Sequence, residues 1–377
     1  MQKIKRSLFR YLNVLIGVCF FLFFKPSVFS QSAKLPFSVS GQLEYAKLLP
    51  HHKMMYPLAE QDFLNFKIDF SKQRTGKFYW EQKYNYPEVG ITFLYSELSS
   101  PEQIGSAFAL MPFMNIFLNP NKKLRHSFYF ACGIGYLTDK FDRLENYKNI
   151  GIGSHFNAAI RIFYHLQFPI SQHFSLESGF GLTHFSNGAT MHPNRGLNQM
   201  SVGLGLRYQN IRPSLNVLVA DSVFRKTWEP QFYFNAGYKR LFVGDETAYG
   251  AFTLGTAVLW KYSLLKAALL GLDVFYDASD VAFYKVNGTI LPAHRFLKTG
   301  LYLGHQWSMN RLSFGIQFGG YLYAPNKVGD VGDFYNRLVL RYKANKSLSF
   351  NFAIKAHFAK ADFMEWGLVY HPKFILR

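Results

Sequence analysis

The sequence predicts an all-β protein that crosses a membrane as an antiparallel β-barrel of roughly 12–16 strands. Aromatic residues make up 18% of the 377-residue chain, with 40 Phe and 24 Tyr, as expected where rings line a membrane interface. Beyond residue 30, no stretch has the roughly eighteen consecutive apolar residues of a transmembrane helix. Short segments of alternating apolar and polar residues recur instead, which is typical of barrel strands. The alternative, a soluble β-sandwich, would be unusually large at this length.

The first thirty residues have the features of a secretory signal. Basic residues occur before position 11, and an uninterrupted apolar run covers residues 14–24. Val28 and Ser30 are small enough for the positions before a cleavage site at Gln31. The apolar run is short for a membrane span, so cleavage is favoured over an uncleaved anchor. We therefore expect residues 1–30 to be a cleaved signal peptide and the chain to be exported to the outer membrane of a Gram-negative bacterium.

The alternation predicts one barrel formed by residues 31–377, because no linker composition or second domain is visible. Residues 31–80 leave three alternatives open: a plug, a periplasmic extension, or extra strands, one or two of which fall within 36–71. Polar or Gly/Pro-containing turns separate the predicted strands. These strands are 87–96, 104–118, 125–137, 155–168, 172–186, 197–210, 229–242, 250–260, 264–276, 295–308, 311–323, 334–342, 347–358 and 363–371.

The chain is basic, with a formal net charge of +19. For a soluble protein this balance would suggest nucleic acid as a partner. The basic residues are scattered rather than clustered, however, and the anionic neighbours in an outer membrane are lipid phosphates. We therefore interpret the charge as compatibility with an anionic lipid surface, and expect no nucleic-acid partner.

Three polar residues fall on the predicted lipid-facing side of adjacent strands. His184 and Ser186 continue the apolar face of the strand 172–186. Asn198 shares its parity with the apolar residues of the next strand. If residues 187–197 form the hairpin loop between these strands, Asn198 lies beside His184 and Ser186 on the outer wall.

This arrangement is suited to nucleophilic catalysis. His184 is placed to take the proton of Ser186, and Asn198 to accept from the other ring nitrogen and fix the tautomer. Amides of the turn Asn187–Ala189, which includes Gly188, or the side chain of Asn194 are candidates for stabilising the oxyanion. Histidines elsewhere lack metal-ligand spacing, so we assign no metal and no cofactor.

His-x-Ser alone is a weak signal. His173-Phe174-Ser175 has the same spacing, is predicted to face the lumen, and has no expected chemical role. Polar residues at the end of a strand are also common in the interfacial girdle of a barrel. The spacing therefore leaves a structural explanation open.

The stretch His184-Phe185-Ser186-Asn187-Gly188, with Pro193-Asn194-Arg195-Gly196, resembles the active-site segment of outer-membrane lipid A 3-O-deacylases (PagL-type, also called acyloxyacyl hydrolases). The resemblance implies that His184 is the base and Ser186 the nucleophile of an ester hydrolase. In that family a Glu follows the His by fourteen residues, where this chain has Asn198. A less specific similarity extends over most of residues 80–370.

The same segment is also similar to outer-membrane phospholipase A, whose third catalytic residue is an Asn at the position of Asn198. The calcium-binding Arg of that family is replaced by Ala189, so the resemblance does not support a calcium cofactor. We therefore predict an outer-membrane serine esterase that acts on lipid A or a related outer-leaflet lipid. The alternatives left open are a phospholipase A and a non-enzymatic barrel or pore, and the oligomeric state is also open.

Overall fold

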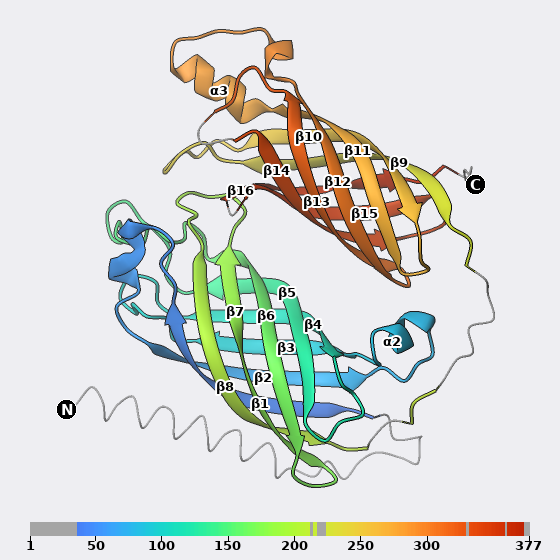
Figure 1. The fold of residues 1–377 in the computed structure, drawn as a ribbon. Helices are drawn as coiled ribbons and strands as arrows, with labels where there is room; N and C mark the ends of the chain where they lie inside the picture. Colours follow the sequence, from blue (N-terminus) through green and yellow to red (C-terminus); the bar gives the residue numbers. More distant parts are fainter. Residues whose placement is uncertain (1–35, 212–213, 217–223, 329–331, 359, 373–377) are drawn as a thin grey trace. The chain divides into compact units, whose positions relative to one another are not determined.

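The structure, a computed structural model, describes residues 36–372 except 212–213, 217–223, 329–331 and 359. The expected signal peptide lies outside the described residues. Within them the chain forms two closed antiparallel barrels of eight strands each (Figure 1). The prediction of an all-β barrel protein is confirmed, and the sixteen strands lie at the upper end of the predicted range.

The number of barrels differs from the prediction of a single barrel. Strand β8 pairs with β1 and closes the first sheet, and β16 pairs with β9 and closes the second. The alternation of apolar and polar residues is the same in both sheets, so it predicts strands without showing where a sheet closes.

The first barrel contains the strands that precede residue 210. They are β1 (Ser38–Leu48), β2 (Phe63–Gln73), β3 (Glu88–Ser96), β4 (Ala107–Phe117), β5 (Arg125–Leu137), β6 (Phe156–Pro169), β7 (Phe174–Ser186) and β8 (Leu197–Gln209). Two short helices lie in its loops, η1 (Lys53–Leu58) and α2 (Tyr79–Lys83). Residues 31–80 were expected to form a plug, a periplasmic extension or extra strands. The described residues of this segment contain strands β1 and β2 of the barrel.

The second barrel begins at residue 227. Its strands are β9 (Thr227–Lys239), β10 (Tyr249–Lys261), β11 (Lys266–Asp277), β12 (Lys298–Met309), β13 (Leu312–Tyr323), β14 (Phe334–Lys343), β15 (Leu348–His357) and β16 (Lys360–Tyr370). The connection from β11 to β12 carries α3 (Ala278–Val286) and η2 (Ala293–Phe296). In the part of the chain that the structure describes, no helix has both the length and the apolarity needed to cross a membrane.

The wall of the first barrel separates apolar from polar side chains by strand parity. On β7, Phe180 and Leu182 are exposed on the outer face, whereas Glu177 and Thr183 are buried. Outer apolar residues suit contact with lipid, and inner polar residues need partners. Those partners cross the lumen: Arg161 on β6 forms an ion pair with Glu44 on β1.

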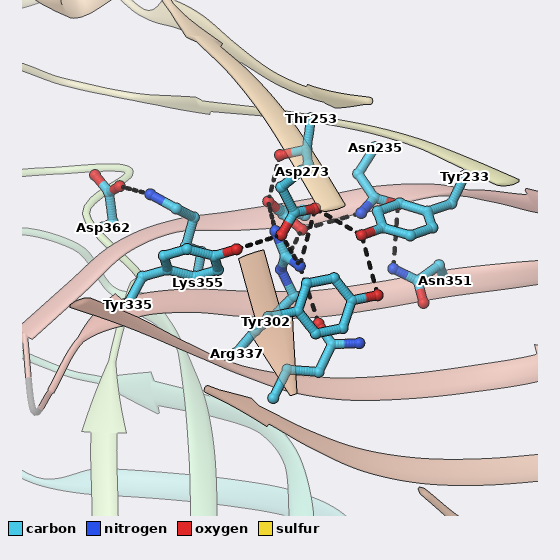
Figure 2. A network of polar contacts seen from close by, with 12 residues as sticks. Tyr233, Asn235, Thr253, Asp273, Tyr302, Tyr335, Arg337, Asn351, Lys355 and Asp362 are labelled. Carbon is cyan, nitrogen blue, oxygen red and sulfur yellow. Dashed lines mark hydrogen bonds and ion pairs between the residues drawn. The ribbon is translucent and has the colours of Figure 1, made fainter. Parts of the chain in front are cut away.

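The lumen of the second barrel is crossed in the same way. Arg337 on β14 lies 3.2 Å from Asp273 on β11 and 3.1 Å from Glu365 on β16. Figure 2 shows Asp273 at the centre of this network, where it also accepts from the hydroxyls of Tyr233 at 2.6 Å and Tyr335 at 2.7 Å. Each lumen is therefore occupied by side chains bonded across it.

Four connections of the first barrel, including the active-site hairpin loop, lie at one end. Residues 49–62, 97–106, 138–155 and 187–196 each follow an odd-numbered strand, and adjacent antiparallel strands turn at opposite ends. Loops 138–155 and 187–196 meet in an isolated bridge between Ile152 and Asn194. The end of β7 and the beginning of β8, where the polar residues lie, therefore belong to this end of the barrel.

Candidate active site

His184 and Asn198 face one another across the β7–β8 ladder. They are directly paired in the strand register, and His184 Nδ1 lies 2.6 Å from Asn198 Oδ1. Because an amide oxygen only accepts, His184 Nδ1 carries the hydrogen. The other ring nitrogen, Nε2, is then the unprotonated one in the neutral ring. The structure thus brings these two residues together as the parity of the strands predicts.

Ser186 lies two positions after His184 on the same face of β7, as the last residue of that strand. Both side chains are half-buried on the outer wall. The neighbouring strand β6 places Ala158 opposite Ser186 and Ile160 opposite His184. Among the hydrogen bonds of the described residues there is none between Ser186 and His184. Catalytic contacts of this kind are often long until a substrate is bound.

Asn187 organises the loop that follows Ser186. It is 2% exposed, and its Nδ2 donates to Ser154 Oγ at 2.8 Å and to the Met191 carbonyl at 3.0 Å. Its backbone N–H donates to Asn194 Oδ1 at 3.0 Å. The side chain of Asn187 and this N–H are thus engaged by its own loop and by Ser154 of loop 138–155, which supports a structural role for Asn187.

The remaining oxyanion candidates of the sequence analysis have different surroundings. Gly188 and Ala189 have φ values of 61° and 64°, so two successive residues adopt the left-handed conformation, in which neighbouring N–H groups form an anion-binding concavity. Asn194 is half-buried and uses its Oδ1 to accept from Asn187. Its Nδ2, which is a donor, therefore has a fixed orientation. Gly188, Ala189 and Asn194 therefore stay candidates for the oxyanion donors.

A second loop supports the active-site loop. The N–H of Gly196 donates to the carbonyl of Gly151 at 3.1 Å, and Ile152 forms its bridge with Asn194. A Cβ on Gly153 would lie 2.8 Å from the His192 carbonyl carbon, so only glycine permits this close approach. Loop 138–155 therefore fixes the backbone on both sides of Asn194.

Gly196 allows the chain to pass directly over the imidazole of His184. Its φ is +77°, and an added Cβ would lie 2.7 Å from His184 Cε1 and 3.2 Å from the Phe185 carbonyl oxygen. Both the backbone conformation and the space require glycine here. The backbone at Gly196 thus covers one side of the His184 ring. Exclusion of water from the ring strengthens its hydrogen bond to Asn198.

His51 is a residue of this site that the sequence analysis does not identify. Its Nδ1 lies 3.1 Å from Asn198 Nδ2. It belongs to loop 49–62, which follows β1, and β1 pairs with β8 to close the barrel. No local pattern places His51 near Asn198, because the contact depends on a pairing between strands far apart in the sequence.

The other His-x-Ser pair forms no comparable arrangement. His173 precedes β7, and its Nδ1 contacts the backbone carbonyl of Gln209 at 3.0 Å. Ser175 lies on the opposite face of the strand from Ser186. Within the described part of the chain, no group of His, Cys, Asp and Glu is arranged to hold a metal ion.

Two family models match parts of the chain. The sequence model of the family "Lipid A 3-O-deacylase (PagL)" matches residues 67–207, and that of "Acyloxyacyl hydrolase, C-terminal domain" matches residues 228–374. Together these two matches cover most of the chain, with one match on each barrel. No curated protein matches the chain.

Similarity to solved structures is distant. Neisserial surface protein A aligns with 46% of this chain and 96% of its own, at 8% identity and a TM-score of 0.33. A mutant porin of Rhodopseudomonas blastica aligns with 89% of this chain and 99% of its own, at 9% identity and a TM-score of 0.20. We base no conclusion on either similarity.

Proposed function

The chain belongs to the lipid A 3-O-deacylase (PagL) family, and on that premise we propose that Ser186, His184 and Asn198 form its catalytic triad. The protein is an outer-membrane esterase that removes an acyl chain. One observation carries the assignment of residues: His184 Nδ1 bonds to Asn198 Oδ1 at 2.6 Å on the outer wall, beside a serine. Apolar side chains suit a wall facing lipid, so a histidine bonded to an asparagine beside a serine on this wall supports a chemical role.

The proposed reaction begins with attack of Ser186 Oγ on the carbonyl carbon of an acyl ester. His184 Nε2 accepts the hydroxyl proton, and Asn198 Oδ1 holds the ring in the tautomer that leaves Nε2 free. The tetrahedral intermediate collapses as His184 donates its proton to the departing sugar hydroxyl. Water, deprotonated by the same nitrogen, then hydrolyses the acyl-serine ester and releases a fatty acid.

The proposed oxyanion hole consists of the amides of Gly188 and Ala189 together with Asn194 Nδ2. Two features support it: the left-handed conformation of the two turn residues and the bond from Asn187 N–H to Asn194 Oδ1, which orients the amide group of Asn194. Such fixed donors stabilise the developing negative charge without having to reorganise during the reaction.

The substrate is expected to enter laterally from the membrane, because the site lies on the outer wall and not in the lumen. Lipid A carries phosphates beside its acyl chains, and the rim of the site is basic. Arg195 is exposed in the active-site loop, with Nη2 4.0 Å from Met54 Sδ. Lys53, also exposed, lies next to Met54 in loop 49–62. We assign Arg195 and Lys53 to the phosphate groups of the lipid.

Lipid mass spectrometry on outer membranes tests this proposal. Cells would express the wild type, the Ser186→Ala variant or the Ser178→Ala variant, which removes another outer-face serine of β7. Loss of one acyl chain from lipid A is expected with the wild type and Ser178→Ala, and not with Ser186→Ala. Equal deacylation by all three proteins would refute the assignment of the nucleophile.

N-terminal sequencing of the membrane-embedded protein would test the proposed cleavage before Gln31.

A glycerophospholipid is the second candidate substrate, and Asn198 is the observation that favours it. The residue matches the third position of the phospholipase A pattern, and its bond to His184 supports an amide as the partner of the proposed base. The same mass spectra decide between the two candidates. Lysophospholipid in place of deacylated lipid A would identify a phospholipase.

The third alternative, a passive pore, is less well supported. Arg161 and Glu44 join opposite sides of the first lumen, and Arg337 joins Asp273 and Glu365 across the second. A conducting barrel needs a continuous aqueous path. We therefore expect no single-channel conductance in planar bilayers, and a stable ohmic conductance from folded protein would restore this alternative.

A further inference from the structure

The third member of the triad is itself held by a histidine from another part of the chain. Asn198 Nδ2 lies 3.1 Å from His51 Nδ1. An amide nitrogen only donates, so His51 Nδ1 accepts and its ring carries its hydrogen on Nε2. We propose that His51 is a positioning residue that selects the orientation of the Asn198 amide required for catalysis. This inference rests on the proposed function of Ser186 and His184.

The need for such a residue follows from the chemistry of an amide. A carboxylate in the third position offers two equivalent acceptor oxygens, so rotation about its terminal bond changes nothing. An asparagine offers one acceptor and one donor. If the Asn198 amide rotates by half a turn, its Nδ2 faces His184 Nδ1 and stabilises the tautomer that carries the proton on Nε2. That tautomer is unable to accept the proton of Ser186.

The contact with His51 opposes this rotation. With Nδ2 directed at His51 Nδ1, Oδ1 is directed at His184 Nδ1, and both hydrogen bonds are made at once. After rotation, Oδ1 would face the lone pair of His51 Nδ1, and the bond would be kept only if His51 moved its own hydrogen from Nε2 to Nδ1, the less favoured tautomer of an exposed imidazole. Loss of a hydrogen bond of this kind changes the ratio of the two orientations by about fivefold at most.

The backbone fixes His51 at the required distance. The N–H of Leu49 donates to the Asn198 carbonyl at 2.7 Å, immediately beyond the β1–β8 ladder. One residue further on, His52 Nδ1 accepts from the Met54 N–H at 3.2 Å at the start of η1. His51 therefore lies between two anchored points of its loop, although its own side chain is exposed.

The test compares the rate constants of variants purified as folded barrels. His51→Ala is expected to lower kcat for ester hydrolysis by up to about fivefold with KM unchanged, because the fraction of competent tautomer falls by no more than one such hydrogen bond allows. His51→Glu keeps an acceptor for Asn198 Nδ2 and has no donor for Oδ1, and is expected to return kcat to within about twofold of the wild type. His52→Ala loosens the same loop without touching Asn198, so we expect it to change kcat by less than about twofold.

The decisive arm places His51→Ala in an Asn198→Asp background. Both oxygens of a carboxylate accept from His184, so the loss of His51 is expected to change kcat by less than about twofold there. An equal loss in the two backgrounds, no loss in the Asn198 background, or failure of His51→Glu to restore kcat would each overturn the inference. Ser186→Ala distinguishes failure of the proposed function from failure of this inference. If Ser186→Ala remains active, the proposed function fails. If Ser186→Ala is inactive and His51→Ala is unaffected, only the role of His51 is refuted.

Discussion

On the outer wall of the first barrel, His184 on β7 lies opposite Asn198 on β8, whereas on the second barrel His305 on β12 lies opposite Ile316 and Ala268. The second barrel also has an asparagine on its outer face, Asn336 on β14, but strand β13 separates it from β12. His305 contacts the hydroxyl of Tyr262 at 2.5 Å, so polar contacts occur on both walls. A histidine bonded to an asparagine beside a serine is found on the first.

The two lumens, in contrast, are alike. Each is crossed by buried arginine–carboxylate pairs, Arg161 with Glu44 and Arg207 with Glu88 in the first barrel, and Arg337 with Asp273 in the second. Polar residues thus have two different surroundings in one fold. Lumen residues bond to each other across the barrel, and the polar residues on the outer wall of the first barrel are those to which we assign a catalytic role.

The largest effect is expected from removing the base. His184→Ala is expected to lower kcat for hydrolysis of a lipid ester by at least about a thousandfold, because Ser186 then has no proton acceptor. His305→Ala removes the outward-facing histidine of the second barrel and is expected to leave kcat unchanged. Steady-state hydrolysis in detergent micelles measures both. A comparable loss in the two variants would show that the walls are not functionally distinct.

The second effect concerns the oxyanion. Asn194→Ala removes the proposed side-chain donor and is expected to lower kcat about a hundredfold with a small change in KM. Asn336→Ala is the matched change on the second wall and is expected to have no effect on either constant. A decrease in substrate affinity with unchanged kcat for Asn194→Ala would assign that residue to binding and not to the transition state.

Gly196→Ala is expected to reduce kcat about tenfold, because the added Cβ must displace the His184 ring from Asn198. Gly41→Ala is a suitable control, since a Cβ there meets nothing within 4 Å. Gel mobility of unboiled samples would confirm that both variants are folded. Full activity of Gly196→Ala would indicate that the loop moves away from His184 during catalysis.

A smaller effect is expected at the rim. Arg195→Glu should raise KM for lipid A about threefold at low ionic strength, and the difference should shrink at high salt because the interaction is exposed and screened. Arg311→Glu makes the same charge change in an exposed turn of the second barrel and should not alter KM. A salt-independent change in KM for Arg195→Glu would point to a steric cause.

The smallest effect on activity is expected from the lumen of the second barrel. Arg337→Met leaves Asp273 and Glu365 buried without their cation, which should destabilise the folded protein by about 3–5 kcal/mol. The kcat of the protein that remains folded is expected to be unchanged. Urea unfolding followed by tryptophan fluorescence, with activity measured in parallel, tests both statements. Loss of kcat in fully folded Arg337→Met would show that the second barrel takes part in catalysis.

The sequence predicts the strands well because their signal is local. Alternation on β7 predicts that Glu177 faces inward and Phe180 outward, and both orientations are observed. It also distinguishes Ser186, on the outer face, from Ser175, on the inner face. The pairing of β8 with β1 is not a local property, so the closure of two barrels is absent from the prediction.

The placement of the candidate site residues depends on the same distinction between local and distant contacts. His184, Ser186 and Asn198 lie on two adjacent strands joined by one hairpin, so parity is sufficient to place them together. His51 reaches Asn198 through the closing pair of strands, and the support of Asn187 by Ser154 comes from another loop. Neither contact has a signature in the spacing of residues.

The proposed chemistry depends on Ser186, on the outer wall of the first barrel, being the nucleophile. The most direct measurement treats the purified, folded protein with a fluorophosphonate, which reacts covalently with activated serines, and maps the modified peptide by mass spectrometry. We predict a single modified residue, Ser186, with loss of esterase activity in proportion to modification and no reaction of the His184→Ala variant. An active enzyme that is inactivated through a different serine, or that retains full activity after Ser186 is modified, would contradict the claim.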